Sequence, residues 1–247
     1  MKIDLVFPAP LMNAAGSLGF APDARHMASL GEPGAFVTNP VSLSPRSPAQ
    51  SRGLVAFPGG FLLHSGYPNP GLKAVIRRYA PRWASADVPV IVHLLAHEEG
   101  EIAAMVRRLE NVEGVSAMEI GLPPEASREL AARLIQAGTG ELPVIARLPL
   151  ERAHELSALA VQAGAAAVSL GPPRGAIPAL DGSLLRGRLY GPAIFPFTLA
   201  AVQALASSRI PVIAGGGVYR RLDAEAMLSA GALAVQLDTV FWRGGWR

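Results

Sequence analysis

Two stretches of the chain, QAGAAAVSLG at residues 162–171 and SAGALAVQLD at residues 229–238, share one pattern. Each begins at the end of a helical pattern, passes through a glycine (Gly164 or Gly231) and ends in a short apolar run. Glycine is typical of the position just after a helix, where the backbone needs a positive φ. The apolar run lacks alternation, which is typical of a strand covered on both faces. The repeat therefore predicts helix–strand units around a parallel sheet.

Similar apolar runs recur along the chain and alternate with helical patterns. The predicted strands cover residues 11–16, 35–40, 89–95, 117–122, 143–148, 166–170, 210–214 and 233–237. The clearest helical patterns cover residues 72–83, 102–109, 124–137, 151–163, 196–206 and 223–230. Eight strands in 247 residues predict a single (β/α)8 barrel domain over residues 1–247. A doubly wound open sheet is the alternative, although no G-x-G-x-x-G motif follows the first strand.

Composition excludes several classes of site. The chain has no cysteine, which excludes disulfides, thiolate metal ligands and a cysteine nucleophile. It has no run of eighteen apolar residues, and its start, MKIDLVFPAP, lacks the apolar stretch of a signal peptide. We therefore expect a cytoplasmic protein that does not span a membrane.

The basic residues are almost all arginine. The net charge is +3, and of 22 basic residues only Lys2 and Lys73 are lysine, which leaves 20 arginines. They are scattered without the clustered stripe that nucleic-acid binding needs, so we expect no nucleic-acid partner. The scarcity of lysine also removes the usual Schiff-base residue.

Two predicted connections are longer than a barrel requires. They cover residues 41–68 and 171–194, and both are rich in glycine and proline. Both follow strands, and function in such barrels lies at the carboxyl ends of the strands. The two segments are therefore candidates for a lid over a ligand site.

The predicted strand ends resemble those of one enzyme family. The stretches LMNAAGSLGF, AFVTNPVSLSPRSP, GYPNPGL, PVIARL, YGPAIFP and IPVIAGGGV, in this order, resemble the dihydroorotate dehydrogenase family. The resemblance implies a barrel that holds FMN across its top and oxidises dihydroorotate to orotate. It also implies a cysteine or serine base after the fourth strand, asparagines on the substrate and two lysines near the flavin.

The resemblance assigns a set of cofactor positions, with two departures at the lysines. Asn39 stands where the family has its first lysine and so loses the charge, whereas Arg147 replaces the second lysine and keeps it. A buried arginine on a barrel strand is costly without an anionic or π-rich partner, which favours a ligand role for Arg147. The other cofactor positions that the resemblance implies are Ala14, Ala15, Gly16, Gly191, Gly216, Gly217 and Thr239.

The phosphate end departs further from the family. Asp238 precedes Thr239 where the family has glycine. A carboxylate beside a phosphate is repulsive. FMN binding is therefore expected to be weak or lost, unless Asp238 points away or pairs with an arginine.

The predicted substrate side has fewer hydrogen-bonding side chains than the resemblance implies. Asn69 matches a family asparagine. It can also be the N-cap of the next helix, with Pro70 at the first helical position. His64 lies nearby in the same loop and can meet a ligand. Gly121 replaces an asparagine, and the stretch GPPR at residues 171–174 replaces another. Loss of such hydrogen-bonding groups weakens recognition steeply.

The catalytic turn of the family corresponds here to EIGLPPEAS, residues 119–127. Pro123 and Pro124 occupy the region of the base and offer no titratable group, so we assign no catalytic residue. Pro124 instead suits the first turn of the following helix. We expect a dihydroorotate dehydrogenase-like flavoprotein with weak or altered activity. The alternatives are a non-catalytic partner or regulatory subunit, or a non-redox barrel that binds a phosphorylated small molecule.

Two further features complete the sequence hypothesis. His93 and His97 lack a third residue at metal-ligand spacing, so structural roles are favoured over a metal site. The tail VFWRGGWR, residues 240–247, is too short for a full eighth helix, so barrel wall is left uncovered. Because Trp and Arg often anchor interfaces, we expect a homodimer through this region. The alternative is a tail that folds back over the gap.

Overall fold

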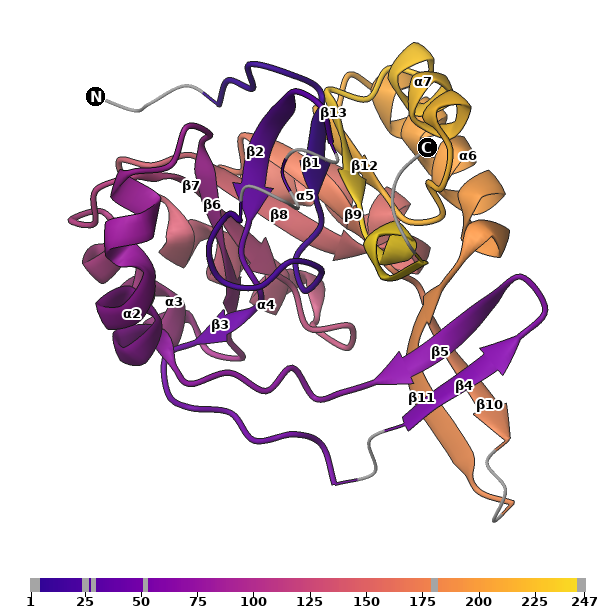
Figure 1. Cartoon of the computed structure of the whole chain (residues 1–247), viewed down its shortest axis with the longest axis horizontal. Helices are drawn as coiled ribbons and strands as arrows, with labels where there is room; N and C mark the ends of the chain where they lie inside the picture. The colour runs from indigo at the N-terminus through magenta and orange to yellow at the C-terminus, as the bar shows by residue number, and fades with distance from the viewer. Residues whose placement is uncertain (1–4, 24–26, 28–29, 51–52, 179–181, 244–247) are drawn as a thin grey trace.

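A computed structural model describes residues 5–23, 27, 30–50, 53–178 and 182–243. Eight parallel strands form a closed barrel, because β2 pairs with β6 as well as with β1. The strands in barrel order are β1 (Leu11–Asn13), β2 (Pro33–Val37), β6 (Val90–Leu95), β7 (Val115–Gly121), β8 (Val144–Pro149), β9 (Ala167–Gly171), β12 (Val212–Gly215) and β13 (Ala234–Leu237). All eight predicted strands are present, and the barrel excludes the open-sheet alternative (Figure 1).

The repeated stretches form the predicted helix–strand junctions. Helix α5 (Ala153–Gln162) leads into β9, and α7 (Arg221–Ser229) leads into β13. Gly164 has φ 107° and Gly231 has φ 103°. In each repeat the glycine N–H and the next N–H donate to carbonyls of the last helical turn, as in a Schellman motif. The two glycines therefore end the helices and turn the chain into the barrel.

Helices pack around the outside of the barrel. They are α2 (Leu72–Ala84), α3 (Glu99–Leu109), α4 (Arg128–Gly138), α5, α6 (Phe195–Ser207) and α7, with the 3-10 turns η1 (Leu150–Arg152), η2 (Pro192–Ile194) and η3 (Thr239–Arg243). In the described part of the chain only η3 follows β13, so the eighth helix is short, as predicted.

Two predicted helix starts are wrong. Helix α4 begins at Arg128, and the hydroxyl oxygen of Ser127 accepts from the Leu130 N–H, so Pro124 lies before the helix rather than in its first turn. Helix α2 begins at Leu72 with Gly71 at the N-cap position. Asn69 is therefore not an N-cap; its carboxamide oxygen accepts from the Gly71 N–H and fixes the turn before the helix.

The two long connections pair with each other. The first contributes β3 (Val41–Ser42), β4 (Gly53–Phe57) and β5 (Gly60–His64), and the second contributes β10 (Arg174–Pro178) and β11 (Leu184–Tyr190). Strands β10, β11, β5 and β4 form a separate antiparallel sheet, joined through Arg188 and Leu63. Figure 1 shows this sheet standing beside the carboxyl end of the barrel. We call these four strands the lid sheet.

The C-terminal turn joins the lid sheet to the barrel. In η3 the ring of Trp242 stacks on Phe61 of β5, with centroids 6.2 Å apart, and lies 6.5 Å from Tyr190 of β11. Its indole N–H donates to the Ser17 carbonyl at 3.3 Å. The described part of the tail therefore folds back over the barrel end, and residues 244–247 lie outside the described residues.

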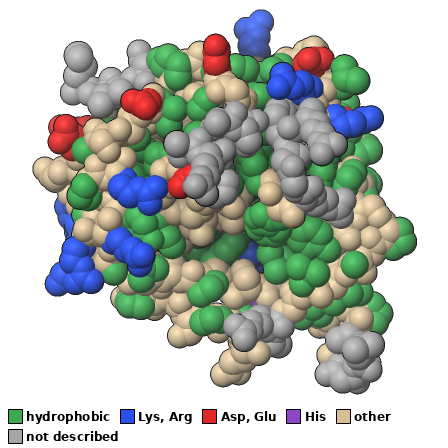
Figure 2. Space-filling view, in the orientation of Figure 1, with side chains coloured by type: hydrophobic (Ala, Val, Ile, Leu, Met, Phe, Trp, Pro, Cys, Tyr) green, Lys and Arg blue, Asp and Glu red, His purple; other side chains and the backbone are tan. Residues whose placement is uncertain are grey.

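The distribution of basic side chains and the apolar character of the helices can be read from the structure. Basic side chains on the face in Figure 2 are spread out rather than gathered into one stripe. Within the part of the chain that the structure describes, no helix is long and apolar enough to cross a membrane.

Candidate functional site: a polar layer beneath a cationic cavity

The barrel interior changes from apolar to polar toward the carboxyl ends of the strands. Its apolar layer includes Ile91, Ala117, Ile145, Ala167 and Ala234, all buried together. Side chains two residues apart on a strand point to the same face. The next inward positions are therefore His93, Glu119, Arg147, Ser169 and Gln236. We call these five residues the polar layer.

Glu119 is the centre of the polar layer and is completely buried. Its Oε1 accepts hydrogen bonds from Ser169 Oγ at 2.6 Å and Gln236 Nε2 at 2.8 Å. Arg147 Nη1 lies 3.4 Å from the same oxygen and donates to Gln236 Oε1 at 2.5 Å. The other carboxylate oxygen, Oε2, lies 2.6 Å from His93 Nδ1. Both oxygens of the buried carboxylate therefore have hydrogen-bond partners, as burial of a charge requires.

The charges of the layer balance each other. Burial alone would raise the pKa of Glu119, but Arg147 and the hydrogen bond from His93 hold it well below its usual range. Burial lowers the pKa of Arg147, but Glu119, with smaller contributions from Tyr67, Tyr190 and Asp238, outweighs burial, so the pKa of Arg147 is raised. Glu119 and Arg147 are thus an ion pair at neutral pH.

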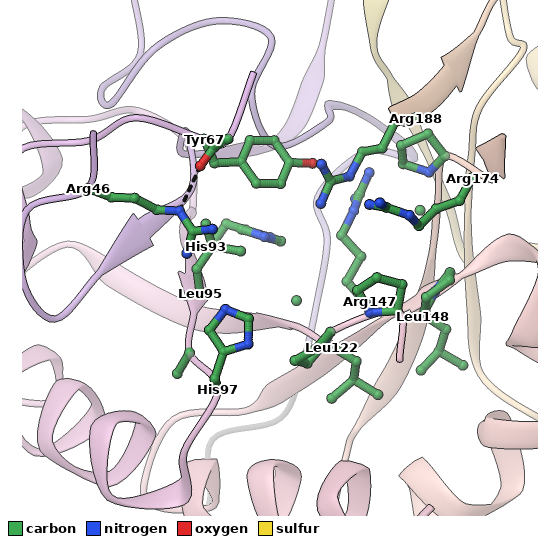
Figure 3. A pocket seen from close by; sticks show the side chains of 18 of the residues that line it. Arg46, Tyr67, His93, Leu95, His97, Leu122, Arg147, Leu148, Arg174 and Arg188 are labelled. Atoms are coloured by element: carbon green, nitrogen blue, oxygen red, sulfur yellow. Dashed lines mark hydrogen bonds between the residues drawn. The ribbon is translucent and has the colours of Figure 1, made fainter. Parts of the chain in front are cut away.

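A cavity of about 280 Å³ opens directly above the polar layer. Its floor includes Arg147 and His93, and its walls include Arg46, Arg174 and Arg188 from the two long connections. Figure 3 shows Arg147, Arg174 and Arg188 close together, with His93 and His97 across the cavity from them. Among the described residues that line the cavity there is no carboxylate. The cavity therefore favours an anion of small-molecule size.

The lid sheet and its flanking loop shape the upper wall. Tyr67 has φ 54°, a left-handed conformation that is unusual for a side chain of this size. The guanidinium of Arg188 lies 3.9 Å from the centre of the Tyr67 ring, a cation–π contact. Arg46 Nε donates to the Gly66 carbonyl at 2.6 Å and so fixes the same loop (Figure 3). The wall is thus an ordered arrangement of aromatic and cationic groups.

The structure brings only part of the predicted site to this cavity. Of the eleven predicted site residues, all described, Arg147 and His64 line it. Asn69 is buried elsewhere, where its carboxamide bonds to Ser42, Tyr67 and Gly71 and ties the loop to the barrel. The Asn39 carboxamide accepts from the Gly19 N–H at 3.0 Å.

The remaining assigned residues lie at the other side of the barrel end. Ala14 continues β1 and donates its N–H to the Leu237 carbonyl at 2.7 Å, with Ala15 and Gly16 after it. Gly191 approaches the turn at Gly59 so closely that a side chain would collide with its carbonyl. Gly217 packs in the same way against the Phe195 backbone at the start of α6, beside Gly216.

At the predicted phosphate end of the cofactor site, Thr239 bonds to a side chain of the protein itself, Asp238. The Thr239 N–H donates to the Asp238 carboxylate, and the Thr239 hydroxyl lies 3.1 Å from the same oxygen. Burial raises the pKa of Asp238 despite these bonds. At Thr239, a position that the resemblance assigns to the cofactor, the N–H and the hydroxyl thus contact the buried Asp238 carboxylate. An ionised carboxylate there would repel a phosphate, so Asp238 and Thr239 do not fit the FMN phosphate.

Sequence reasoning missed most of the groups that build the cavity. Glu119, Ser169 and Gln236 each interrupt an otherwise apolar strand, a signal that was present in AMEIG, AVSLG and AVQLD. Arg188 and Tyr67 carried no signal, because pairing between the two long connections brings them together. Pro123 and Pro124 do line the cavity, at its edge. Among the described residues no cluster of potential metal ligands is present.

The fold and the cavity define a (β/α)8 barrel with a ligand site at the carboxyl ends of its strands. The family model for dihydroorotate dehydrogenase matches residues 2–132. The chain belongs to the dihydroorotate dehydrogenase family.

Curated relatives match along most of their length. The "Dihydroorotate dehydrogenase B (NAD(+)), catalytic subunit" of Desulforudis audaxviator (strain MP104C) is 31% identical over 261 residues, which cover 95% of this chain and 83% of the relative. The protein of the same name from Geobacter sp. (strain M21) is 30% identical and covers 93% of this chain and 82% of the relative. That of Trichlorobacter lovleyi is 29% identical, with 93% and 83% covered.

Proposed function

We propose that the protein is a dihydroorotate dehydrogenase-like oxidoreductase whose cavity binds a small planar carboxylate and whose flavin-dependent activity is weak or altered. The observation that carries this proposal is the cationic cavity above the polar layer. Its position at the strand ends agrees with substrate sites in barrel enzymes. Membership of the family supports dihydroorotate as the substrate class.

The arginines account for recognition of the carboxylate. Arg147 is fixed by Glu119 and Gln236 on the barrel floor, and Arg188 is fixed over the Tyr67 ring. A guanidinium held in one orientation binds a carboxylate with charge-assisted, often bidentate hydrogen bonds. These arginines supply donors on a side of the substrate where Gly121 and the GPPR stretch have lost amide groups. The altered donor set is the reason to expect altered selectivity.

The phosphate end accounts for the weak activity. FMN accepts the hydride in the family, according to the resemblance, but the Asp238 carboxylate engages the donors that would hold its phosphate. The chain's own residues bind the carboxylate, and the cavity floor offers one proton-accepting group, His93.

The test is orotate formation from dihydroorotate with FMN and an artificial electron acceptor supplied in excess. Enzymes ordinarily turn over at about 10 s⁻¹. We expect detectable orotate, formed at least about 100-fold more slowly than this, since correct placement of a reactant contributes factors of that size or more. Complete absence of orotate at saturating FMN would contradict the redox proposal.

A second candidate is a non-catalytic relative that binds the same carboxylate. The buried Asp238 carboxylate favours this candidate, because it accepts the Thr239 N–H at the position that the resemblance assigns to the cofactor. In that case orotate binds, but no orotate forms even when Asp238 is replaced by glycine.

A further inference from the structure

His93 is held so that one ring nitrogen faces the cavity. Its Nδ1 lies 2.6 Å from Glu119 Oε2, and its backbone N–H donates to Thr38 Oγ1 at 3.1 Å. The other nitrogen, Nε2, points toward Gly121, where an added Cβ would lie 2.8 Å from it. His93 is 2% exposed and lines the cavity floor (Figure 3). The ring is thus fixed at its Nδ1 edge, and among the described residues no hydrogen bond holds Nε2, which lies at the cavity floor beside Gly121.

The protonation state of this pair follows from its surroundings. The pKa of Glu119 is well below its usual range, so the proton in the contact belongs to His93 Nδ1. Burial lowers the pKa of His93, Glu119 acts in the opposite direction, and Arg147 and Arg188 add to the lowering. At neutral pH His93 is therefore neutral, and Nε2 carries a lone pair.

We propose that His93 Nε2 accepts a proton from a carbon acid bound in the cavity, with Glu119 as the positioning residue that orients the ring and stabilises the imidazolium. This inference rests on the proposed function, because it takes a dihydroorotate-type carboxylate as the bound molecule. It places the proton acceptor on the third barrel strand rather than in the turn at Pro123 and Pro124. A carboxylate–histidine pair beside a reactive ligand is a recurring arrangement for general-base catalysis.

The step balances without an oxidant. The C–H bond next to the ring carbonyl of dihydroorotate breaks, its electron pair remains on the substrate as an enolate, and an N–H bond forms at Nε2. The enolate gains negative charge in a cavity walled by Arg147, Arg174 and Arg188. In deuterated water Nε2–H exchanges with solvent, and a deuteron returns to the same carbon. The product is labelled dihydroorotate.

Gly121 belongs to the same arrangement. A side chain at this position would meet His93 Nε2 at 2.8 Å and Cε1 at 3.1 Å, and Glu119 prevents the ring from moving freely. The glycine therefore keeps the proton-accepting nitrogen accessible. This gives a physical reason for the loss of the asparagine that the resemblance implies here.

Deuterium incorporation into dihydroorotate in D2O, followed by NMR on the full chain without added flavin, tests the inference. We expect enzyme-dependent exchange at the CH2 next to the ring carbonyl. His93→Gln should slow it about 100-fold or more, the usual contribution of a general base. Gly121→Ala should slow it comparably while His93 and Glu119 remain in place. The matched controls are His154→Gln, an exposed histidine on α5, and Gly100→Ala, which has open space around it, and both should leave exchange unchanged.

Two further readouts separate a chemical role from a structural one. The wild-type exchange rate should rise with pH and be half-maximal below the ordinary histidine value of 6.5, because the pKa of His93 is lowered. Orotate binding by calorimetry should survive in Gly121→Ala within about tenfold, since the arginines are untouched. The groups that face His93 and set this profile are Glu119, Arg147 and Arg188.

The outcomes distinguish this inference from the proposed function. If orotate binds but exchange is absent, or persists at the wild-type rate in His93→Gln, the inference is wrong and the binding proposal stands. If orotate does not bind the wild-type protein, both fail. Exchange that is lost in both variants and kept in both controls supports the inference.

Discussion

At the scale of single residues, we propose that Asp238 limits anion binding at the predicted phosphate end of the cofactor site. Its carboxylate accepts from the backbone and hydroxyl of Thr239 and is buried. Asp238→Gly removes the repulsion and frees those donors, so FMN should bind more tightly, by at least about tenfold for 1.4 kcal/mol. Quenching of FMN fluorescence measures this.

A matched variant isolates the charge. Asp238→Asn keeps the size and an acceptor oxygen but removes the negative charge, and its FMN affinity should fall between those of the wild type and Asp238→Gly. Equal FMN affinity in all three proteins would show that Asp238 does not control the phosphate end.

Ser169 shows how far the polar layer contributes to stability. Its hydroxyl donates to the ionised Glu119 at 2.6 Å in a fully buried position. Ser169→Ala should lower the free energy of unfolding by about 1.5–3 kcal/mol, the range for hydrogen bonds to charged groups. Urea denaturation gives this value. Ser208→Ala, at an exposed helix end, should change it by less than about 0.5 kcal/mol. Equal values for the two variants would contradict the account of the layer.

At the scale of elements, the helix–glycine–strand junctions carry the fold. Gly164 has φ 107° at the end of α5, a conformation that costs a residue with a Cβ about 1–3 kcal/mol. Gly164→Ala should therefore lower the free energy of unfolding by that amount, and a Cβ would also crowd Thr139. Gly100→Ala, inside α3 and without close neighbours, should instead raise stability by up to about 1 kcal/mol. Thermal denaturation of the two variants should shift in opposite directions.

The elements also show what the sequence could and could not predict. All eight strands and their order followed from apolar runs and glycine caps, since both signals are local. The start of α4 was misplaced because Pro124 suits a first helical turn, yet the hydroxyl oxygen of Ser127 accepts from the Leu130 N–H and caps the helix there. The lid sheet was predicted only as two lid segments, because its pairing joins residues more than a hundred positions apart.

The residues of the candidate site were likewise predicted only in part. Arg147 was assigned from the resemblance and His64 from its place in the long loop, and both line the cavity. Glu119 and His93 meet because their strands are neighbours in register, a fact that becomes visible only when the strand order and the inward face are known. Arg188 depends on the pairing of β11 with β5, which no local pattern specifies.

At the scale of the whole molecule, association through the C-terminal region stays a prediction. Trp242 stacks on Phe61 and still exposes 49% of its surface, and Phe197 and Leu222 are 69% exposed. We expect a dimer at tens of micromolar by light scattering after size exclusion, and its weakening by Trp242→Ala because aromatic anchors dominate interfaces. A monomer throughout this range, unchanged by the substitution, would contradict the prediction.

The central claim is that the arginine-walled cavity binds a small planar carboxylate, and titration of the full chain with orotate by calorimetry tests it most directly. We predict saturable binding with one site per chain that weakens with added salt. Arg188→Gln should weaken it about 10- to 100-fold, the equivalent of one charge-assisted hydrogen bond. Arg186→Gln, an exposed arginine on the same strand that does not line the cavity, should leave it unchanged. Absence of saturable heat, or equal affinity in Arg188→Gln and Arg186→Gln, would contradict the claim.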